Sequence, residues 1–153
     1  MNITITTKAP KVDFKLSGSG TATIDWGDGS PETIAVLHWK SNFNHEFNGD
    51  EIHTIIINGD DIIIMMCHEN GITSLDVSNN TVLQILDCSN NEITCLDVSK
   101  STALIKLDCS NNKLTSLDIS KNTEFIELNC SSNQITSLDV SKNTDILKGT
   151  SKN

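Results

Sequence analysis

Hydrophobic and polar positions recur every 21 residues from residue 62 almost to the end of the chain. The blocks begin at Ile62, Leu83, Leu104 and Phe125, and a fifth begins at Ile146. In the third block the apolar positions are Leu104, Leu107, Cys109, Leu114, Leu117 and Ile119. Four full repeats without an insertion indicate a repeat architecture in which each block adds one coil to a stack.

Within each block the pattern predicts β structure. The alternation at Leu107, Asp108 and Cys109 is that of a strand with one buried face. A second short strand is expected at Leu117–Ile119, and the Asn- and Ser-rich segments between the strands are turn formers. No stripe of 3.6-residue period favours a helix. Coils stacked at about 4.8 Å would then form two parallel sheets around a narrow core.

Two polar or reactive residue types also recur at fixed positions. An Asn recurs at Asn70, Asn91, Asn112 and Asn133, and a Cys at Cys67, Cys88, Cys109 and Cys130. A buried Asn in a coil corner can bond neighbouring backbone groups and form a ladder along the stack. The cysteines lie in a line with parallel Cβ vectors, so we expect buried free thiols rather than a zinc site or disulfides. Cys95 replaces the Ser of the other blocks and is expected nearer the surface.

Residues 1–61 have a different composition and are predicted to form a β-rich N-terminal cap, followed by the solenoid over residues 62–153. Only Phe125 follows residue 61 among the aromatic residues; the others are Phe14, Trp26, Trp39, Phe43 and Phe47. The Asp28–Gly29 pair between two β-forming segments predicts a hairpin. A stack end exposes apolar core and strand edges, which a cap would cover. We further predict that residues 54–57 pair in parallel with residues 74–77.

These residues carry two resemblances. The blocks, such as LTSLDISKNT at residues 114–123, resemble the short leucine-rich repeats of bacterial surface proteins, of the LTSLDVSKNT type found in gut Bacteroides. Trp26–Gly27–Asp28–Gly29 resembles the WGDG segment of PKD-like domains, and His45–Glu46–Phe47 resembles their closing motif. Because 61 residues are few for a complete PKD sandwich, a reduced cap is expected. The resemblance implies a mainly β, leucine-rich-repeat solenoid in an extracellular or cell-surface setting, whose repeats bind a ligand.

Charge and hydropathy exclude several function classes. The net charge of −9 argues against nucleic acid, whose phosphates need a basic patch, and against an anionic membrane surface. No apolar stretch reaches the roughly 18 residues of a transmembrane helix. Residues 1–7 lack the basic and apolar segments of a secretory signal peptide. We therefore expect neither nucleic-acid binding nor membrane insertion.

Candidate catalytic and metal-binding groups are sparse. Asp25, Asp28 and Glu32 do not have the spacing of a calcium loop, so a turn role is favoured for Asp28. A carboxylate ladder runs through Asp76, Asp97, Asp118 and Asp139 and is expected to be solvated or bonded to Ser and Thr. The histidines His38, His45, His53 and His68 lack a metal-binding spacing, and His45 is expected to be structural. The chain is predicted to be a non-catalytic binding module without a cofactor; the alternative is a metal or enzymatic site in the cap.

The outward positions of the main strand give the candidate partner-binding face. Its residues are Ile64, Met66, His68, Ile85, Asp87, Lys106, Asp108, Glu127 and Asn129, with Ser89, Ser110 and Ser131 beside them. Ile64, Met66 and Ile85 form its apolar cluster, which is either covered by the cap or exposed as an anchor for a protein partner. The face carries no Trp or Tyr, which disfavours recognition of a glycan by stacking.

The fifth block is irregular. Gly149 and Ser151 stand where the pattern requires Leu and Cys, so residues 146–153 are not expected to complete a coil. Lys148 and Lys152 would blunt the exposed edge. Self-association through this edge is one expectation, and an origin in a longer repeat array is the other.

Overall fold

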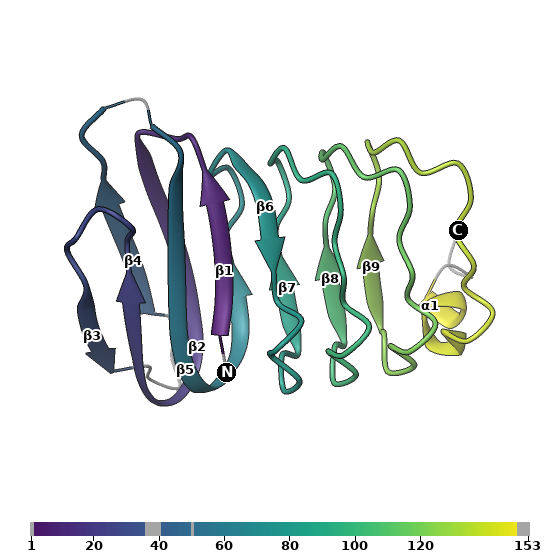
Figure 1. The fold of residues 1–153 in the computed structure, drawn as a ribbon. Helices are drawn as coiled ribbons and strands as arrows, with labels where there is room; N and C mark the ends of the chain where they lie inside the picture. Colours follow the sequence, from purple (N-terminus) through teal and green to yellow (C-terminus); the bar gives the residue numbers. More distant parts are fainter. Residues whose placement is uncertain (1, 36–40, 50, 150–153) are drawn as a thin grey trace.

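A computed structural model describes residues 2–35, 41–49 and 51–149 of the 153-residue chain. The coils follow one another in a row from the N-terminal strands to the C-terminal helix (Figure 1). The elements are β1 (Asn2–Thr7), β2 (Lys11–Asp25), β3 (Glu32–Ala35), β4 (Ser41–Glu46), β5 (His53–Met66), β6 (Ile72–Asp76), β7 (Ile85–Asp87), β8 (Lys106–Asp108), β9 (Glu127–Asn129) and α1 (Thr144–Gly149). The fold is mainly β, as the sequence predicts.

The N-terminal region is organised by the long antiparallel pair of β2 and β5. The pairing runs from Lys15 opposite Met66 to Asp25 opposite Ile56, with register shifts near Gly18 and Ser19. At the shift the two backbones touch, since a Cβ on Gly18 would lie 1.8 Å from the carbonyl oxygen of Asp61. β4 pairs with the first half of β2 and β3 with the second half. The predicted hairpin around Asp28 is therefore confirmed as β2–β3.

One side of every coil is a parallel strand. Ile64 of β5 is in register with Ile85, Lys106 and Glu127 of the next three strands. The inward residues Met65, Leu86 and Leu107 are fully buried. They belong to one hydrophobic core that also contains Phe14, Trp26 and Ile57. The predicted main strand of the repeats is confirmed, and the N-terminal region shares its core.

The prediction of a second strand in each coil is correct for the first coil and wrong for the other three. β6 forms in the first coil, but residues 117–119 and their counterparts in the second and fourth coils are not in strands. In the third coil the Ser120 N–H donates to the Asp118 carboxylate (2.9 Å), and the Asn122 N–H donates to the Ile119 carbonyl (3.0 Å). The first coil makes the same turn bonds after β6, so the difference lies in the pairing: β6 pairs with β1, and residues 117–119 have no such strand partner among the described residues.

The predicted parallel pairing of residues 54–57 with 74–77 is also wrong. β1 lies between these segments: Ile5 is opposite Ile55 on one side and opposite Leu75 on the other, both in antiparallel register. The pattern of Ile55 and Ile57 aligns with Leu75 and Val77 because both segments face the same core. The N-terminal strand therefore joins the cap strands to the first repeat.

The asparagine ladder forms as predicted. The Asn112 side-chain amide donates to the carbonyls of Cys88, Cys109 and Ser110, and its oxygen accepts from the Ile93 N–H. The residue two positions after each ladder cysteine has positive φ, namely Glu69, Asn90, Asn111 and Ser132. The backbone of each coil therefore changes direction at a residue with left-handed φ, and a buried or half-buried Asn follows that residue.

The end of the chain departs from the repeat. Residues 144–149 form the helix α1 instead of a fifth strand, in line with the expectation that this block completes no coil. Ile146 is partly buried against the core. Residues 150–153, including Ser151 and Lys152, lie outside the described residues.

Candidate binding face

The outward side chains of β5, β7, β8 and β9 form two rows, which we call the strand face. One row contains Ile64, Ile85, Lys106 and Glu127, and the other contains Met66, Asp87, Asp108 and Asn129. His68 follows the second row at the end of β5, with its Nδ1 3.5 Å from the Asp87 carboxylate. The structure thus brings all nine candidate residues onto one side of the sheet.

The apolar cluster of this face is partly exposed. Ile64, Met66 and Ile85 are each intermediate in exposure. The strand β2 lies beside them in the same sheet and not over them: Ser17 pairs with Ile64, and Lys15 pairs with Met66. The strand face therefore extends onto the N-terminal strands.

Ion pairs and hydrogen bonds order the polar part of the strand face. Lys106 Nζ lies 2.9 Å from the Glu127 carboxylate, and this hydrogen bond raises the pKa of Lys106. Partial burial by itself raises the pKa of Asp108, but hydrogen bonds from Ser110 and Asn129 hold it below its usual value. Asp108 is therefore ionised at neutral pH with both oxygens engaged.

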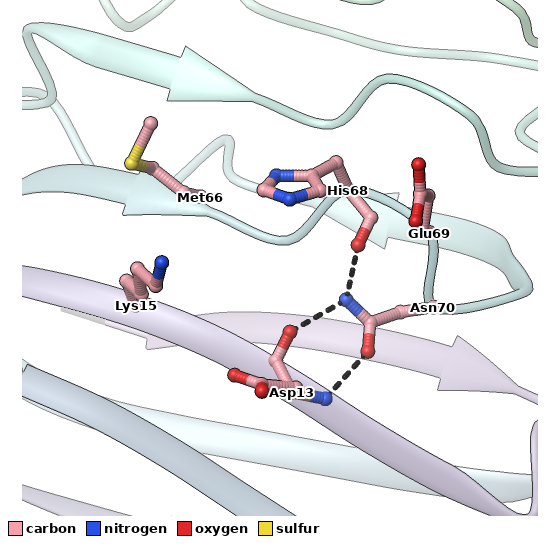
Figure 2. Close-up of a pocket in the computed structure, with 6 residues that line it drawn as sticks. All are labelled: Asp13, Lys15, Met66, His68, Glu69 and Asn70. Carbon is pink, nitrogen blue, oxygen red and sulfur yellow. Dashed lines mark hydrogen bonds between the residues drawn. The ribbon is translucent and has the colours of Figure 1, made fainter.

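A hollow opens where the parallel strands meet the antiparallel cap (Figure 2). It has a volume of about 200 Å³ and is lined by Asp13, Lys15, Met66, His68, Glu69 and Asn70. β2 pairs with β5 up to Met66, beyond which the Asn70 side chain bridges the two segments. Its amide donates to the carbonyls of Asp13 and His68 (2.8 Å each), and its oxygen accepts from the Asp13 N–H (2.6 Å).

The sequence interpretation missed this hollow. The alternation from Lys11 to Leu16 marks a strand whose outward residues include Asp13 and Lys15. It does not tell which strand pairs with it, so it does not place these residues beside His68. Asn70 was assigned only to the ladder.

Behind the strand face lies the cysteine ladder. Cys67, Cys88 and Cys109 are buried free thiols, whereas Cys130 is only partly buried and Cys95 is exposed. Burial raises the pKa of Cys109 to about 12 and also raises that of Cys88. The expectation of inert thiols is thus confirmed for the inner three, and Cys130 departs from it because no described strand follows β9.

Two acidic residues of the cap, Asp28 and Glu32, make structural contacts. The Asp28 carboxylate accepts hydrogen bonds from Ser30 and lies 2.6 Å from His45 Nε2, and these contacts lower its pKa to about 2. His45 stacks on Trp26, with ring centroids 4.6 Å apart. Trp26 Nε1 in turn donates to Glu32 (3.2 Å). His45 is therefore a structural residue of the hairpin, as expected.

The remaining candidates fall into two groups. The carboxylates of Asp76, Asp97, Asp118 and Asp139 each accept a hydrogen bond from the N–H of a Ser two residues on, as expected for Ser-bonded carboxylates. His38 and Trp39 lie outside the described residues.

Within residues 2–35, 41–49 and 51–149, no three His, Cys, Asp or Glu side chains are grouped as metal ligands would be. In the same part of the chain no helix is long and apolar enough to cross a membrane.

Comparison with known proteins agrees with this architecture. No protein-family model and no curated protein sequence matches the chain. Among solved structures, the functional domain of InlJ from Listeria monocytogenes, described as including a cysteine ladder, is similar with a TM-score of 0.52 and 45% identity over 52% of this chain. An internalin (inlF) from Listeria monocytogenes has a TM-score of 0.44 and 28% identity over 45% of this chain.

The match is partial in length. The chain covers 18% of the InlJ structure and 21% of the inlF structure. This chain has its own line of cysteines, Cys67, Cys88, Cys109 and Cys130. The chain therefore folds as a β-rich leucine-rich-repeat solenoid that is similar to the functional domain of InlJ.

Proposed function

We propose that this chain is a non-catalytic module that binds a protein partner through the strand face. The observation that supports this most directly is the partly exposed apolar cluster of Ile64, Met66 and Ile85. It is flanked by charged and polar residues, among them Lys106, Asp108 and Glu127. An apolar centre with a polar rim is the usual anatomy of a protein interface.

The setting is a further proposal. Similarity to the Listeria structures supports a surface or secreted bacterial protein. The resemblance of the repeats to those of gut Bacteroides supports a related source. The hairpin that carries Trp26 and Asp28, closed by His45, supports a reduced PKD-like cap over residues 1–61 ahead of a solenoid over residues 62–153.

A protein partner is favoured over a glycan. A sugar ring that binds by stacking needs an aromatic side chain, and the strand face offers neither Trp nor Tyr. A glycan bound only by the polar residues of β8 and β9 is the second possibility. An array that carries both ligand classes separates the two.

The test compares binding with stability. The labelled chain is applied to protein and glycan arrays, and the experiment is repeated with a Met66→Ser, Ile85→Ser variant. We expect protein binding to fall at least about tenfold while the melting temperature changes little, because both side chains are already partly exposed. Ile52→Ser is the matched control, since Ile52 is 58% exposed and lies off the strand face. Unchanged binding by the double variant, or binding lost only together with stability, contradicts the proposal.

The C-terminal edge supports self-association as an additional property. The N–H groups of Cys67, Cys88 and Cys109 each donate to a carbonyl of the following coil. Cys130 holds the equivalent place in the last described coil, and Leu128 beside it is only partly buried. Edge strands of this kind template pairing with another chain. Sedimentation over a wide concentration range checks this, and a strictly monomeric protein contradicts it.

A further inference from the structure

A further set of outward side chains lies beside the strand face, at the edge where the parallel strands begin. In the third coil Leu104 and Leu107 are fully buried, whereas Ile105 and Lys106 between them are only half-buried. The other coils repeat this pattern of two accessible residues between inward ones, although the inward Leu128 of the last coil is only half-buried. The second residue of each accessible pair belongs to the strand face. The first residues form what we call the edge row, namely Ile63, Gln84, Ile105 and Ile126.

The backbone shows why two neighbouring side chains face outward. The Gln84 carbonyl accepts hydrogen bonds from the N–H groups of both Ile105 (2.9 Å) and Lys106 (3.1 Å). In the next coil the Ile105 carbonyl accepts from the N–H groups of both Ile126 (2.8 Å) and Glu127 (3.1 Å). Two residues of one coil therefore oppose one residue of the coil before, as in a β-bulge, and this interrupts the alternation of side chains. An interpretation based on alternation does not find the edge row.

One isoleucine from each coil contributes to an oblique apolar strip across these rows. Ile64 and Ile85 are in register in the strand face. Ile105 and Ile126 are neighbours in the edge row, and Ile105 directly precedes the residue that is in register with Ile85. Ile126 is 66% exposed, and the other three isoleucines are half-buried. The apolar strip of Ile64, Ile85, Ile105 and Ile126 therefore crosses all four coils and is accessible along its length.

The spacing of the apolar strip matches one turn of an α-helix per coil. Successive coils lie about 4.8 Å apart, so three steps cover roughly 14 Å. Three turns of an α-helix cover roughly 16 Å, and the sideways step from Ile85 to Ile105 lengthens the strip toward this value. Side chains on one face of an extended strand repeat at roughly 6.6 Å, so three steps cover about 20 Å. A helix therefore keeps its apolar side chains on the strip, whereas a strand loses the match.

Charges beside the apolar strip indicate the charge of the partner. Three carboxylates of the strand face stand against one lysine, which leaves a net charge of −2 when His68 is neutral. Lys106 is paired with Glu127 at 2.9 Å, so the uncompensated carboxylates are those of Asp87 and Asp108. Both belong to the second row of the strand face, on one flank of the strip. A partner that lies on the strip therefore meets negative charge on that flank, which favours lysine or arginine there.

We propose that the protein partner presents an amphipathic α-helix, with its apolar stripe along the apolar strip and basic residues toward Asp87 and Asp108. The inference rests on the proposed function of the strand face and adds the kind of partner that binds there. Apolar surfaces that bind amphipathic helices take their anchors at i, i+3, i+4 and i+7 of the helix. In this chain the isoleucine of each coil receives one such anchor.

The test uses a synthetic peptide in place of the whole partner. An acetylated and amidated peptide of Leu, Lys and Ala carries Leu at i, i+3, i+7 and i+10, with Lys beside this stripe. When it is titrated into the 15N-labelled chain, we expect saturable shifts of the amide signals of Ile85, Ile105 and Ile126, and a gain of helical circular dichroism. A peptide of the same composition with Leu at every second position, and a peptide with Glu in place of Lys, should bind at least about tenfold more weakly.

A variant of the edge row then assigns the site. Ile126→Ser should weaken binding of the helical peptide about tenfold, because one of the apolar anchors is lost. The melting temperature should change little, since this side chain is 66% exposed in the free chain. Ile52→Ser is the matched control, because Ile52 is 58% exposed and lies off the strand face. Equal binding of the alternating peptide, preference for the glutamate peptide, or normal peptide binding by Ile126→Ser overturns the inference.

The outcome is distinct from that of the array experiment. If partner binding on the array depends on Met66 and Ile85 but the helical peptide does not bind, the strand face keeps its function and the helical partner is wrong. If the peptide binds through Ile126 while the Met66→Ser, Ile85→Ser variant keeps all partner binding on the array, the proposed function of the strand face is wrong and the inference fails with it.

Discussion

Replacing Asn112 by Ala removes one rung of the asparagine ladder from the middle of the stack. Asn112 makes four hydrogen bonds: its amide donates to the Cys88, Cys109 and Ser110 carbonyls at 2.9, 3.1 and 3.2 Å, and its oxygen accepts from the Ile93 N–H at 2.9 Å. The side chain is almost completely buried. Water therefore cannot easily replace these bonds.

The cost of the substitution follows from which groups lose every partner. The Cys88 and Cys109 carbonyls each keep a bond, from Asn91 and Asn133, and the Ser110 carbonyl keeps one from the Asn90 N–H. The Ile93 N–H has no other acceptor among the described residues. A buried donor left unpaired costs roughly 1–3 kcal/mol, and the lost shared bonds add about 1 kcal/mol, so we expect a loss of about 2–4 kcal/mol.

Urea unfolding followed by circular dichroism measures this loss as a lower midpoint at unchanged slope. Gln134→Ala is the control, because it removes an exposed carboxamide and should cost less than about 0.5 kcal/mol. Asn112→Asp keeps the shape but turns the donor toward three carbonyls into an acceptor, so it should be at least as harmful as Ala. If both Asn112 variants unfold like the wild type, the ladder is not what holds the coils together.

Other parts of the structure lead to four further predictions. Thiol titration of the native protein should label Cys95 at once, because this cysteine is exposed. Cys109→Ser should lower the free energy of unfolding in urea by roughly 1–3 kcal/mol, because it buries a hydroxyl without an assured partner. Ile5→Ala should cost about 2–5 kcal/mol by the same assay, since this buried side chain packs between the cap and the first repeat; a near-neutral result contradicts the bridging role of β1. Ser132→Asn should raise stability by about 0.5–1 kcal/mol, because its φ of 54° suits Asn better; a lower urea midpoint contradicts this. Hydrogen bonds from Ser99 lower the pKa of Asp97 in the folded state. The ionised Asp97 therefore stabilises the fold at pH values above its unfolded pKa near 3.8, and this stabilisation is lost as the pH falls through the lower folded pKa. Asp97→Asn should flatten the acid limb of a plot of melting temperature against pH.

Local features of the sequence were sufficient to predict the main strand and the buried positions of the repeats. The period, the inward positions such as Leu107 and Cys109, and the corner Asn112 all depend on contacts between identical neighbours 21 residues apart. When each coil repeats the last, in-register stacking fixes the partners of every position, and one block predicts the next. This is why the main parallel strand, the asparagine ladder and the burial of Cys67, Cys88 and Cys109 were predicted correctly, whereas Cys130 is only partly buried.

The cap allowed no such prediction, because its strands have no repeating neighbour. The alternation in β1 and in β5 marks both as strands with one buried face, but it carries no information about their order in the sheet. The pattern of Ile55 and Ile57 was therefore aligned with Leu75 and Val77, and the insertion of β1 between them was missed. Strand order here depends on contacts between residues 46 (Thr7 and His53) to 56 (Asn2 and Asn58) positions apart in the chain.

The candidate site, too, was predicted from the sequence only in part. The sequence by itself determined the period, the side of each strand that faces outward and hence the strand face from Ile64 to Asn129. Only the tertiary structure decided that β2 continues this sheet, that Ile64, Met66 and Ile85 stay partly exposed, and that Asp13 and Lys15 lie beside His68 and Glu69. The physical reason is that side-chain alternation is a local property of the backbone, whereas the choice of neighbouring strand depends on which distant segments bury their apolar faces together.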